Sequence, residues 1–281
     1  MHPDRAFALL LGLVVYVTLG LGLSGKEISG PDVSHWTIEE VLRFTAPEAR
    51  QGVTVDADHL YVLGNREIGK YEKRTLAKVG TWKDQADGPV IHFNAGLVRQ
   101  GELVVAHSNY PQIPMTGSVE SFDAETLQPL RRHSFGHYFG SLTWVDRREG
   151  SWFACFAHYG NRAAEPNRDP TWTNLVRFDD EWRRTGGWVF PRALFEHIGG
   201  DYTLSGGAFG PGGLLYVTGH DNQQMHVLKF PALGSVMEWL GWVDVPFAGQ
   251  AFAWDPQDPM VLYGIIKGTR EVVVCRLVES K

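Results

Sequence analysis

A unit that recurs five times along the chain is the feature that most constrains its fold. In each copy an apolar strand begins at a small or amide residue, a turn containing Gly or Asp follows, and an aliphatic strand then ends in polar residues. Self-similarity of this kind is typical of architectures that stack one supersecondary unit many times. The first strands of the five copies begin at Gln51, Asn94, Gly140, Ser205 and Gly249.

Each copy has the length and strand content of a propeller blade. Short turns such as DADH, RQGE and DPQDP join the first two strands of a copy, which is typical of a β-hairpin, and a third and a fourth strand follow. The copies start 43, 46, 65 and 44 residues apart. These spacings predict an all-β fold, a five-bladed β-propeller with four-stranded antiparallel blades.

The two ends of the repeat predict how the ring closes. The fifth copy reaches Lys281 after only its third strand, while an unassigned strand-like run, TIEEVLRFTA, precedes the first copy. We expect residues 36–45 to supply the missing outer strand of the last blade, because closure removes the exposed edge of an open sheet. Five blades of about 50 residues then account for residues 25–281 as a single domain.

The segment GPGGLLYVTGHD, residues 210–221, combines a glycine turn with an aliphatic strand and a polar end. In this pattern it resembles blades of the gluconolactonase-like and cycloisomerase-like propellers. The resemblance to five-bladed propellers extends over residues 36–281. Its motifs are generic to propellers, so the resemblance implies the fold and leaves the reaction open.

The N-terminus predicts export. The 18 residues from Ala6 to Leu23 contain no charge and follow Arg5, and the small residues Gly22 and Ser24 can flank a cleavage site. We expect residues 1–24 to be a signal peptide, with a retained membrane anchor as the alternative. The mature chain would then be a secreted or periplasmic monomer that touches a membrane only through an uncleaved N-terminus.

Charge and cysteine content narrow the choice of partner. With 26 Lys and Arg against 32 Asp and Glu, the net charge is -6, so the chain has no overall basic field for nucleic acid and we expect a small-molecule ligand. Cys155 and Cys275 each lie inside a strand-like run, which predicts two separate buried thiols rather than a disulfide.

Propeller geometry predicts a site at the central channel, where first strands enter and second strands leave. Second strands of three copies end in AHSN, AHYGN and GHDN, which place His107, His158 and His220 at similar positions, and His92 enters the same face. Converging imidazoles are typical metal ligands, so the four residues predict a divalent ion such as Zn, Fe, Cu or Ca that polarises a carbonyl or activates water.

Other polar residues are expected at the same face, where Asp221 would act as a base or would orient a histidine. The candidates for binding a polar substrate are Asn65, Asn94, Asn109, Tyr110, Tyr138, Asn161 and Gln250. Three interpretations stay open: a metal site, a metal-free pocket lined by His and Asn, and a ring of polar residues with a structural role only.

Two functions follow from these interpretations. The first is an enzyme, a hydrolase, lyase or isomerase that acts on a small polar substrate in the central channel. The alternative is a non-enzymatic propeller whose rim, with Tyr110, Trp172 and Tyr202, holds a ligand, a glycan or a protein. Glycosidase chemistry based on paired carboxylates is disfavoured, because no carboxylate stands at the five strand entrances.

Overall fold

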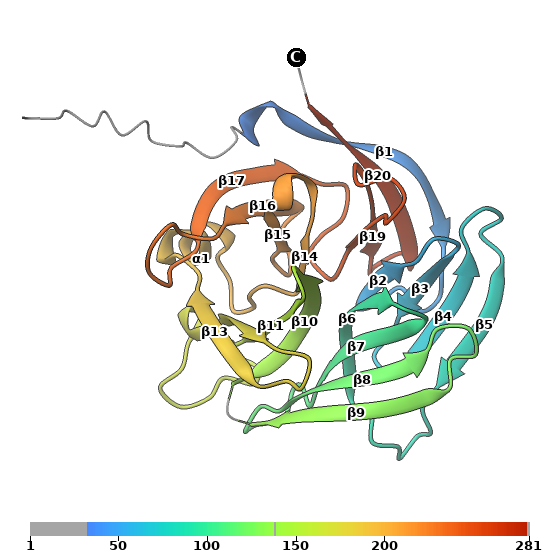
Figure 1. Ribbon diagram of the computed structural model, residues 1–281, viewed down its shortest axis with the longest axis horizontal. Coiled ribbons are helices and arrows are strands. Elements are labelled where there is room, and N and C mark those ends of the chain that lie inside the picture. Colours follow the sequence, from blue (N-terminus) through green and yellow to red (C-terminus); the bar gives the residue numbers. More distant parts are fainter. Residues whose placement is uncertain (1–32, 138, 280–281) are drawn as a thin grey trace, which may run out of the picture.

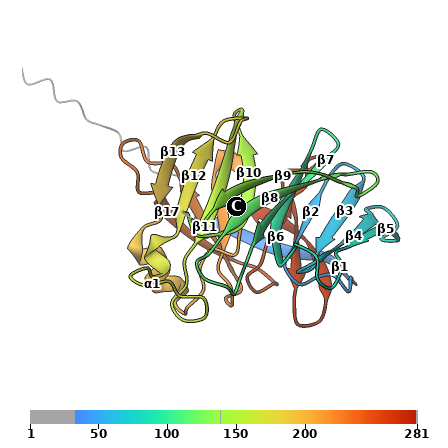
Figure 2. The same ribbon diagram turned by 90° about the horizontal axis from the view of Figure 1, so that it is seen from below.

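The five predicted blades form a closed ring. The computed structural model describes residues 33–137 and 139–279, and in it five four-stranded antiparallel sheets surround a central axis (Figure 1). The expected signal peptide and Tyr138 lie outside the described residues and stay predictions. Viewed from the side, the short helix α1 (Arg192–Ile198) lies at one end of the ring (Figure 2).

The strands of each blade follow the chain from the inside of the ring to the outside. Blade 1 consists of β2 (Gly52–Val55), β3 (His59–Leu63), β4 (Glu67–Glu72) and β5 (Lys78–Lys83). Blade 2 consists of β6 (His92–Arg99), β7 (Glu102–Ser108), β8 (Gly117–Asp123) and β9 (Pro129–Gly136). Blade 3 consists of β10 (Ser141–Arg148), β11 (Ser151–Ala157), β12 (Asn174–Phe178) and β13 (Arg184–Val189).

The last two blades complete the ring. Blade 4 consists of β14 (Gly206–Phe209), β15 (Leu215–Thr218), β16 (Gln224–Lys229) and β17 (Glu238–Asp244). Blade 5 consists of β18 (Ala253–Trp254), β19 (Val261–Ile266), β20 (Glu271–Glu279) and the N-terminal β1 (Trp36–Thr45). The short helices are η1 (Val33–His35), η2 (Pro170–Trp172) and η3 (Pro211–Gly213).

Closure by the N-terminal strand is confirmed. Strand β1 pairs with β20 in antiparallel register, from Trp36 opposite Glu279 to Thr45 opposite Glu271, with one bulge between Glu40 and Leu42. Both ends of the described chain therefore lie in one blade (Figure 1). The C-terminal strand gains a hydrogen-bonded neighbour on the side that would otherwise be an open edge.

Among the described residues, five apolar clusters lie one between each pair of neighbouring blades, and a smaller sixth cluster consists of Met115, Ala157 and Tyr159. Leu103 of blade 2, for example, packs with Leu63 of blade 1, and Leu142 of blade 3 packs with Val104 of blade 2. Every blade is thus apolar on both faces, which explains why its inner strands are almost continuously buried. Cys155 and Cys275 lie in two different clusters as free buried thiols, as the sequence predicted.

One glycine shows how tightly blades 3 and 4 meet. Trp144 of β10 is fully buried, and a Cβ atom at Gly207 of β14 would lie only 2.3 Å from its indole ring. No side chain larger than hydrogen fits at residue 207. Glycine at this position therefore allows the two strands to approach this closely. Across the described part of the chain, no helix has the length and apolar character required to cross a membrane.

Phe44 provides a test of ring closure, because it connects β1 of blade 5 to blade 1. Its ring lies 5.7 Å from that of Tyr71 on β4, whereas Val41, in the bulge of β1, is 57% exposed. We expect Phe44→Ala to lower the unfolding free energy by about 1–3 kcal/mol and the melting temperature by roughly 3–10 °C. Val41→Ala is the control, and equal melting temperatures for the two variants would contradict a closing role for β1.

Candidate functional site

A cavity of about 470 Å³ opens at the centre of the ring and is lined by residues of all five blades. Its floor consists of buried polar side chains, among them Gln51, Asn94 and Gln250, and its mouth is exposed. Six of the residues predicted from the sequence line this one cavity: Asn65, His92, Asn94, Tyr110, His220 and Gln250. The structure therefore brings together half of the predicted site.

Three cationic side chains surround the mouth of this cavity. Arg50, Arg162 and Lys267 line it, none of them forms an ion pair with a described residue, and no Asp or Glu is among the described residues of the lining. The pKa of Lys267 lies below its ordinary value because its amine is partly buried and because Arg270 and Arg50 repel its charge. Such a mouth attracts anions.

His220 is oriented by its neighbour in the sequence. Its Nδ1 lies 2.6 Å from Oδ1 of Asp221, and its ring stacks on Tyr202 with the ring centres 4.3 Å apart. A proton on Nδ1 donated to the carboxylate leaves Nε2 as the free, basic nitrogen. Asp221 itself is largely exposed and lies outside the cavity lining. The pair thus has the geometry of a general base and the carboxylate that orients it.

His92 is the second imidazole of the cavity, and it is neutral. Burial, followed by the positive charge of Lys267, lowers its pKa to about 3. Its ring lies 5.1 Å from that of Tyr110, whose hydroxyl is 3.0 Å from the hydroxyl of Tyr202. Burial and this hydrogen bond raise the pKa of Tyr110 to about 12. At neutral pH this wall consequently offers only uncharged hydrogen-bonding groups to a ligand.

His107 lies outside the cavity, in a hydrogen-bonded network within blade 2. The amide of Ile91 donates to its Nε2 at 3.0 Å, and its Nδ1 is 2.9 Å from the hydroxyl of Ser118, which in turn donates to Glu120. Both ring nitrogens are therefore occupied. Burial lowers the pKa of His107 to about 4, so this imidazole is neutral and fixes the entrance of β6.

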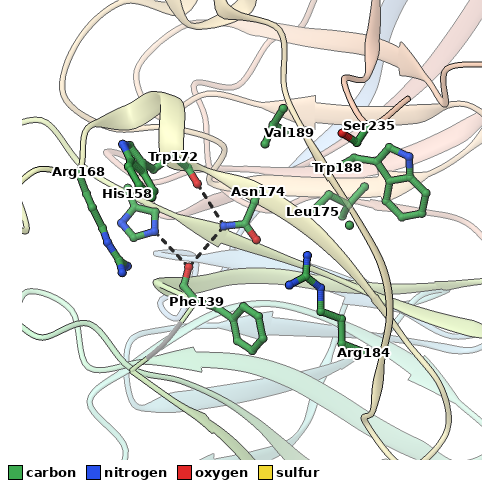
Figure 3. A pocket seen from close by; sticks show the side chains of 11 residues that line it. Phe139, His158, Arg168, Trp172, Asn174, Leu175, Arg184, Trp188, Val189 and Ser235 are labelled. Atoms are coloured by element: carbon green, nitrogen blue, oxygen red, sulfur yellow. Dashed lines mark hydrogen bonds between the residues drawn. The ribbon is translucent and has the colours of Figure 1, made fainter. Parts of the chain in front are cut away.

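His158 lines a different hollow, beside blade 3 (Figure 3). Its Nε2 donates to the carbonyl oxygen of Phe139 at 3.1 Å, and burial lowers its pKa. The reason for the separation is the register of the strand ends. His107 is still inside β7, His158 follows β11 directly, and His220 comes two residues after β15. Because side chains alternate along a strand, His107 and His158, two positions apart relative to the strand end, point to the same side, away from the cavity. His220 lies one position further along and points to the other side, into the cavity.

The expected metal site is therefore reduced to two imidazoles, His92 and His220, at the central cavity. Over residues 33–137 and 139–279, no group of three or more His, Cys, Asp or Glu side chains is arranged to hold a metal ion. The prediction of a divalent ion bound by four histidines gains no geometric support from these side chains.

Two of the predicted asparagines hold loops. The side chain of Asn109 donates to the carbonyl oxygen of Pro114 at 2.9 Å and accepts from the amide of Thr116 at 2.8 Å. Asn161 donates to the carboxylate of Asp201. Neither lines the central cavity, since both have their amides engaged in fixing the long connections of blades 2 and 3.

Sequence reasoning missed Arg50 and Arg162 as site residues. Arg50 immediately precedes the first strand of blade 1, and Arg162 follows the polar end of β11 in a long connection. Lys267 carried a usable signal, because it occupies the second-strand exit of blade 5, in the segment equivalent to the histidine-bearing exits. Lys267 was not predicted because the site residues at these strand ends were chosen for their histidines, and blade 5 has none there.

Comparison with known proteins supports the fold. No family model and no curated protein matches the sequence. Among solved structures, the glutaminyl cyclase of Myxococcus xanthus aligns with a TM-score of 0.60 and 10% identity, over 88% of this chain and 98% of that one. A luciferin-regenerating enzyme aligns with a TM-score of 0.51 and 11% identity, over 86% and 95% of the two chains. The chain is thus a five-bladed propeller with enzymes among its structural neighbours.

The buried neutral state of His107 predicts a loss of stability in acid. Its pKa is about 4 in the folded chain and 6.5 in a solvated reference state, so the unfolded chain takes up the proton first as the pH falls from about 6.5 to 4. The contribution of the neutral His107 to the free energy of unfolding is therefore fully present above pH 6.5 and is lost as the pH falls towards 4. We expect His107→Gln to have a shallower decrease in the urea-unfolding free energy between pH 7 and 5, and an unchanged slope would contradict the assignment.

Proposed function

We propose that the chain is an enzyme that binds a small, carboxylate-bearing polar molecule in the central cavity and transfers a proton with His220 as the general base. The observation that carries this proposal is the charge of the cavity: Arg50, Arg162 and Lys267 lie at its mouth, and no described carboxylate lines it. Isomerase and lyase reactions next to a carboxylate both begin with such a proton transfer.

The cationic mouth supports an anionic ligand. Guanidinium groups bind carboxylates through two parallel hydrogen bonds, and an ammonium group adds a compact charge. With a volume of about 470 Å³, the cavity has room for a molecule of metabolite size and lies within the range of small-molecule sites. The net charge of the whole protein is -6, so the cationic mouth is a local feature rather than a general property of the surface.

The amide-rich floor supports a polar rather than an apolar body for the ligand. Nε2 of Gln51 donates to Oδ1 of Asn65 at 2.6 Å, which orients Oε1 of Gln51 and Nδ2 of Asn65 for other partners. Nδ2 of Asn94 donates to the carbonyl of Leu142 at 2.7 Å, so its Oδ1 is available as an acceptor. Hydroxyl groups of a substrate would satisfy these groups.

The proton-transfer step rests on the His220–Asp221 pair. Nε2 of His220 would take a proton from the substrate, and Asp221 would stabilise the imidazolium that forms. Arg162 and Lys267 would neutralise the negative charge that then develops next to the substrate carboxylate. The neutral His92 would donate or accept a hydrogen bond without carrying charge. A binding protein that holds the same anion without turnover is the second candidate, favoured by the cationic mouth alone.

Anion binding is tested with gluconate, a hydroxycarboxylate, and glucose, a sugar without the carboxylate. We expect gluconate, but not glucose, to raise the melting temperature of the protein. The Lys267→Met variant should need about tenfold or more gluconate for the same rise. Lys83→Met is the matched control, because Lys83 is an exposed lysine on the outer strand β5. Equal effects of the two variants, or a response to glucose, would refute an anionic site.

Catalysis is tested by solvent exchange of the proton next to the carboxylate. In deuterium oxide, we expect the NMR signal of that proton of gluconate to decay in the presence of the protein. His220→Gln should slow the decay by roughly 10²–10⁴-fold while gluconate affinity stays within a few-fold, because a general base contributes to rate rather than to binding. Retained exchange in the variant refutes His220 as base, and binding without any exchange favours the binding protein.

A further inference from the structure

A second hollow lies on the outer part of blade 3, between β12, β13 and the short helix η2, and its volume is about 390 Å³ (Figure 3). We infer that it is a binding site for an acidic saccharide, a sugar chain that carries carboxylates. It shares no lining residue with the central cavity. Binding in this hollow therefore does not depend on the reaction proposed for the central cavity.

Two arginines supply the charge of this hollow. Arg168 and Arg184 line it, and no Asp or Glu is among its described lining residues. Arg168 is ion-paired with Glu165 at 3.4 Å, so Arg184 is the cation without a carboxylate partner. The side chain of Arg184 forms no hydrogen bond or ion pair with any residue in the described ranges, whereas the adjacent Arg183 is held by Asp179 and Glu181. A Cβ atom at Gly187 would lie 2.8 Å from Nη2 of Arg184, so the glycine leaves room for the guanidinium group over the sheet.

Two indoles supply flat apolar faces. Trp172 is 53% exposed although it is the largest type of apolar side chain, and Arg168 lies over its ring at 5.6 Å. Trp188 is half-buried, and its ring is held against Phe230 with the centres 4.8 Å apart. In Figure 3 the two tryptophans lie on opposite sides of Asn174. An exposed indole beside cationic groups is a common surface for ligand binding.

Asn174 supplies an oriented acceptor between the two indoles. Its Nδ2 donates to the carbonyl oxygen of Trp172 at 3.1 Å and to that of Phe139 at 3.5 Å (Figure 3). These bonds fix the amide, so that Oδ1 is left to accept from a ligand. The hydroxyl of Ser235 lies on the far side of the same hollow. The start of η2, which carries Trp172, is held by the side chain of Asp169, which accepts from the amide of Thr171 at 2.8 Å.

This combination favours a saccharide with carboxylates over other anions. An inorganic anion would use the arginines but not the indoles, and an aromatic carboxylate would leave Asn174 and Ser235 without hydroxyl donors. A uronic-acid residue has a carboxylate for a guanidinium, hydroxyls for the amide and the serine, and an apolar C–H face for an indole. A short chain of such residues would place groups of each kind along the hollow.

The experiment is calorimetric titration of the full chain with trigalacturonate, its methyl-esterified form, 1-naphthoate and inorganic phosphate. We expect trigalacturonate to bind, the uncharged ester to bind about tenfold or more weakly, and the other two to show no comparable binding. Arg184→Ala should lower the trigalacturonate affinity by about tenfold or more. Arg183→Ala, the matched control, should leave it unchanged because Arg183 is already paired.

Three results would overturn the inference. They are equal effects of Arg184→Ala and Arg183→Ala, tighter binding of 1-naphthoate or phosphate than of trigalacturonate, and equal binding of the charged and esterified sugars. Trp172→Ala should also weaken binding, whereas Trp242→Ala, at an exposed tryptophan on blade 4, should not. Lys267→Met should leave trigalacturonate binding intact, because Lys267 lines the central cavity and not this hollow.

Discussion

Apolar packing between neighbouring blades is the interaction on which the rest of the structure depends. Each blade buries both of its faces, and the five clusters between blades form a continuous ring to which β1 (36–45) adds Phe44, Trp36 and Ile38. A single sheet of four short strands could not bury its two apolar faces alone. Ring closure removes the open edge, fixes the spacing of the inner strands and defines the central cavity that they surround.

The cavity shows how such a ring distributes polar groups. Side chains at the strand ends leave the apolar layers and gather around the axis, where Gln51, Asn94 and Gln250 form a buried floor. Cationic residues from loops lie at the mouth. Because Arg50, Arg162 and Lys267 line the cavity and no described Asp or Glu does, the cavity and the overall negative protein have opposite electrostatic character.

The fold was predictable to the level of individual strands, since periodic alternation, hairpin turns and the repeat spacing all reflect local backbone preferences. The missing strand of the last blade was predictable for the same reason. The site was only partly predictable. His92 and His220 reach the cavity, whereas His107 and His158 turn away, because a shift of one residue at a strand end redirects the side chain.

The sequence by itself determined the number of blades, their strand content and the way the ring closes, because these follow from short-range periodicity and from the count of repeats. Only the tertiary structure decided which polar groups face one another. It placed Arg162 and Lys267, more than one hundred residues apart, at one mouth, and it gathered Arg184, Trp172 and Asn174 at a second hollow. Contacts between residues so far apart in the sequence depend on the paths of the loops and on side-chain directions, which local sequence patterns do not predict.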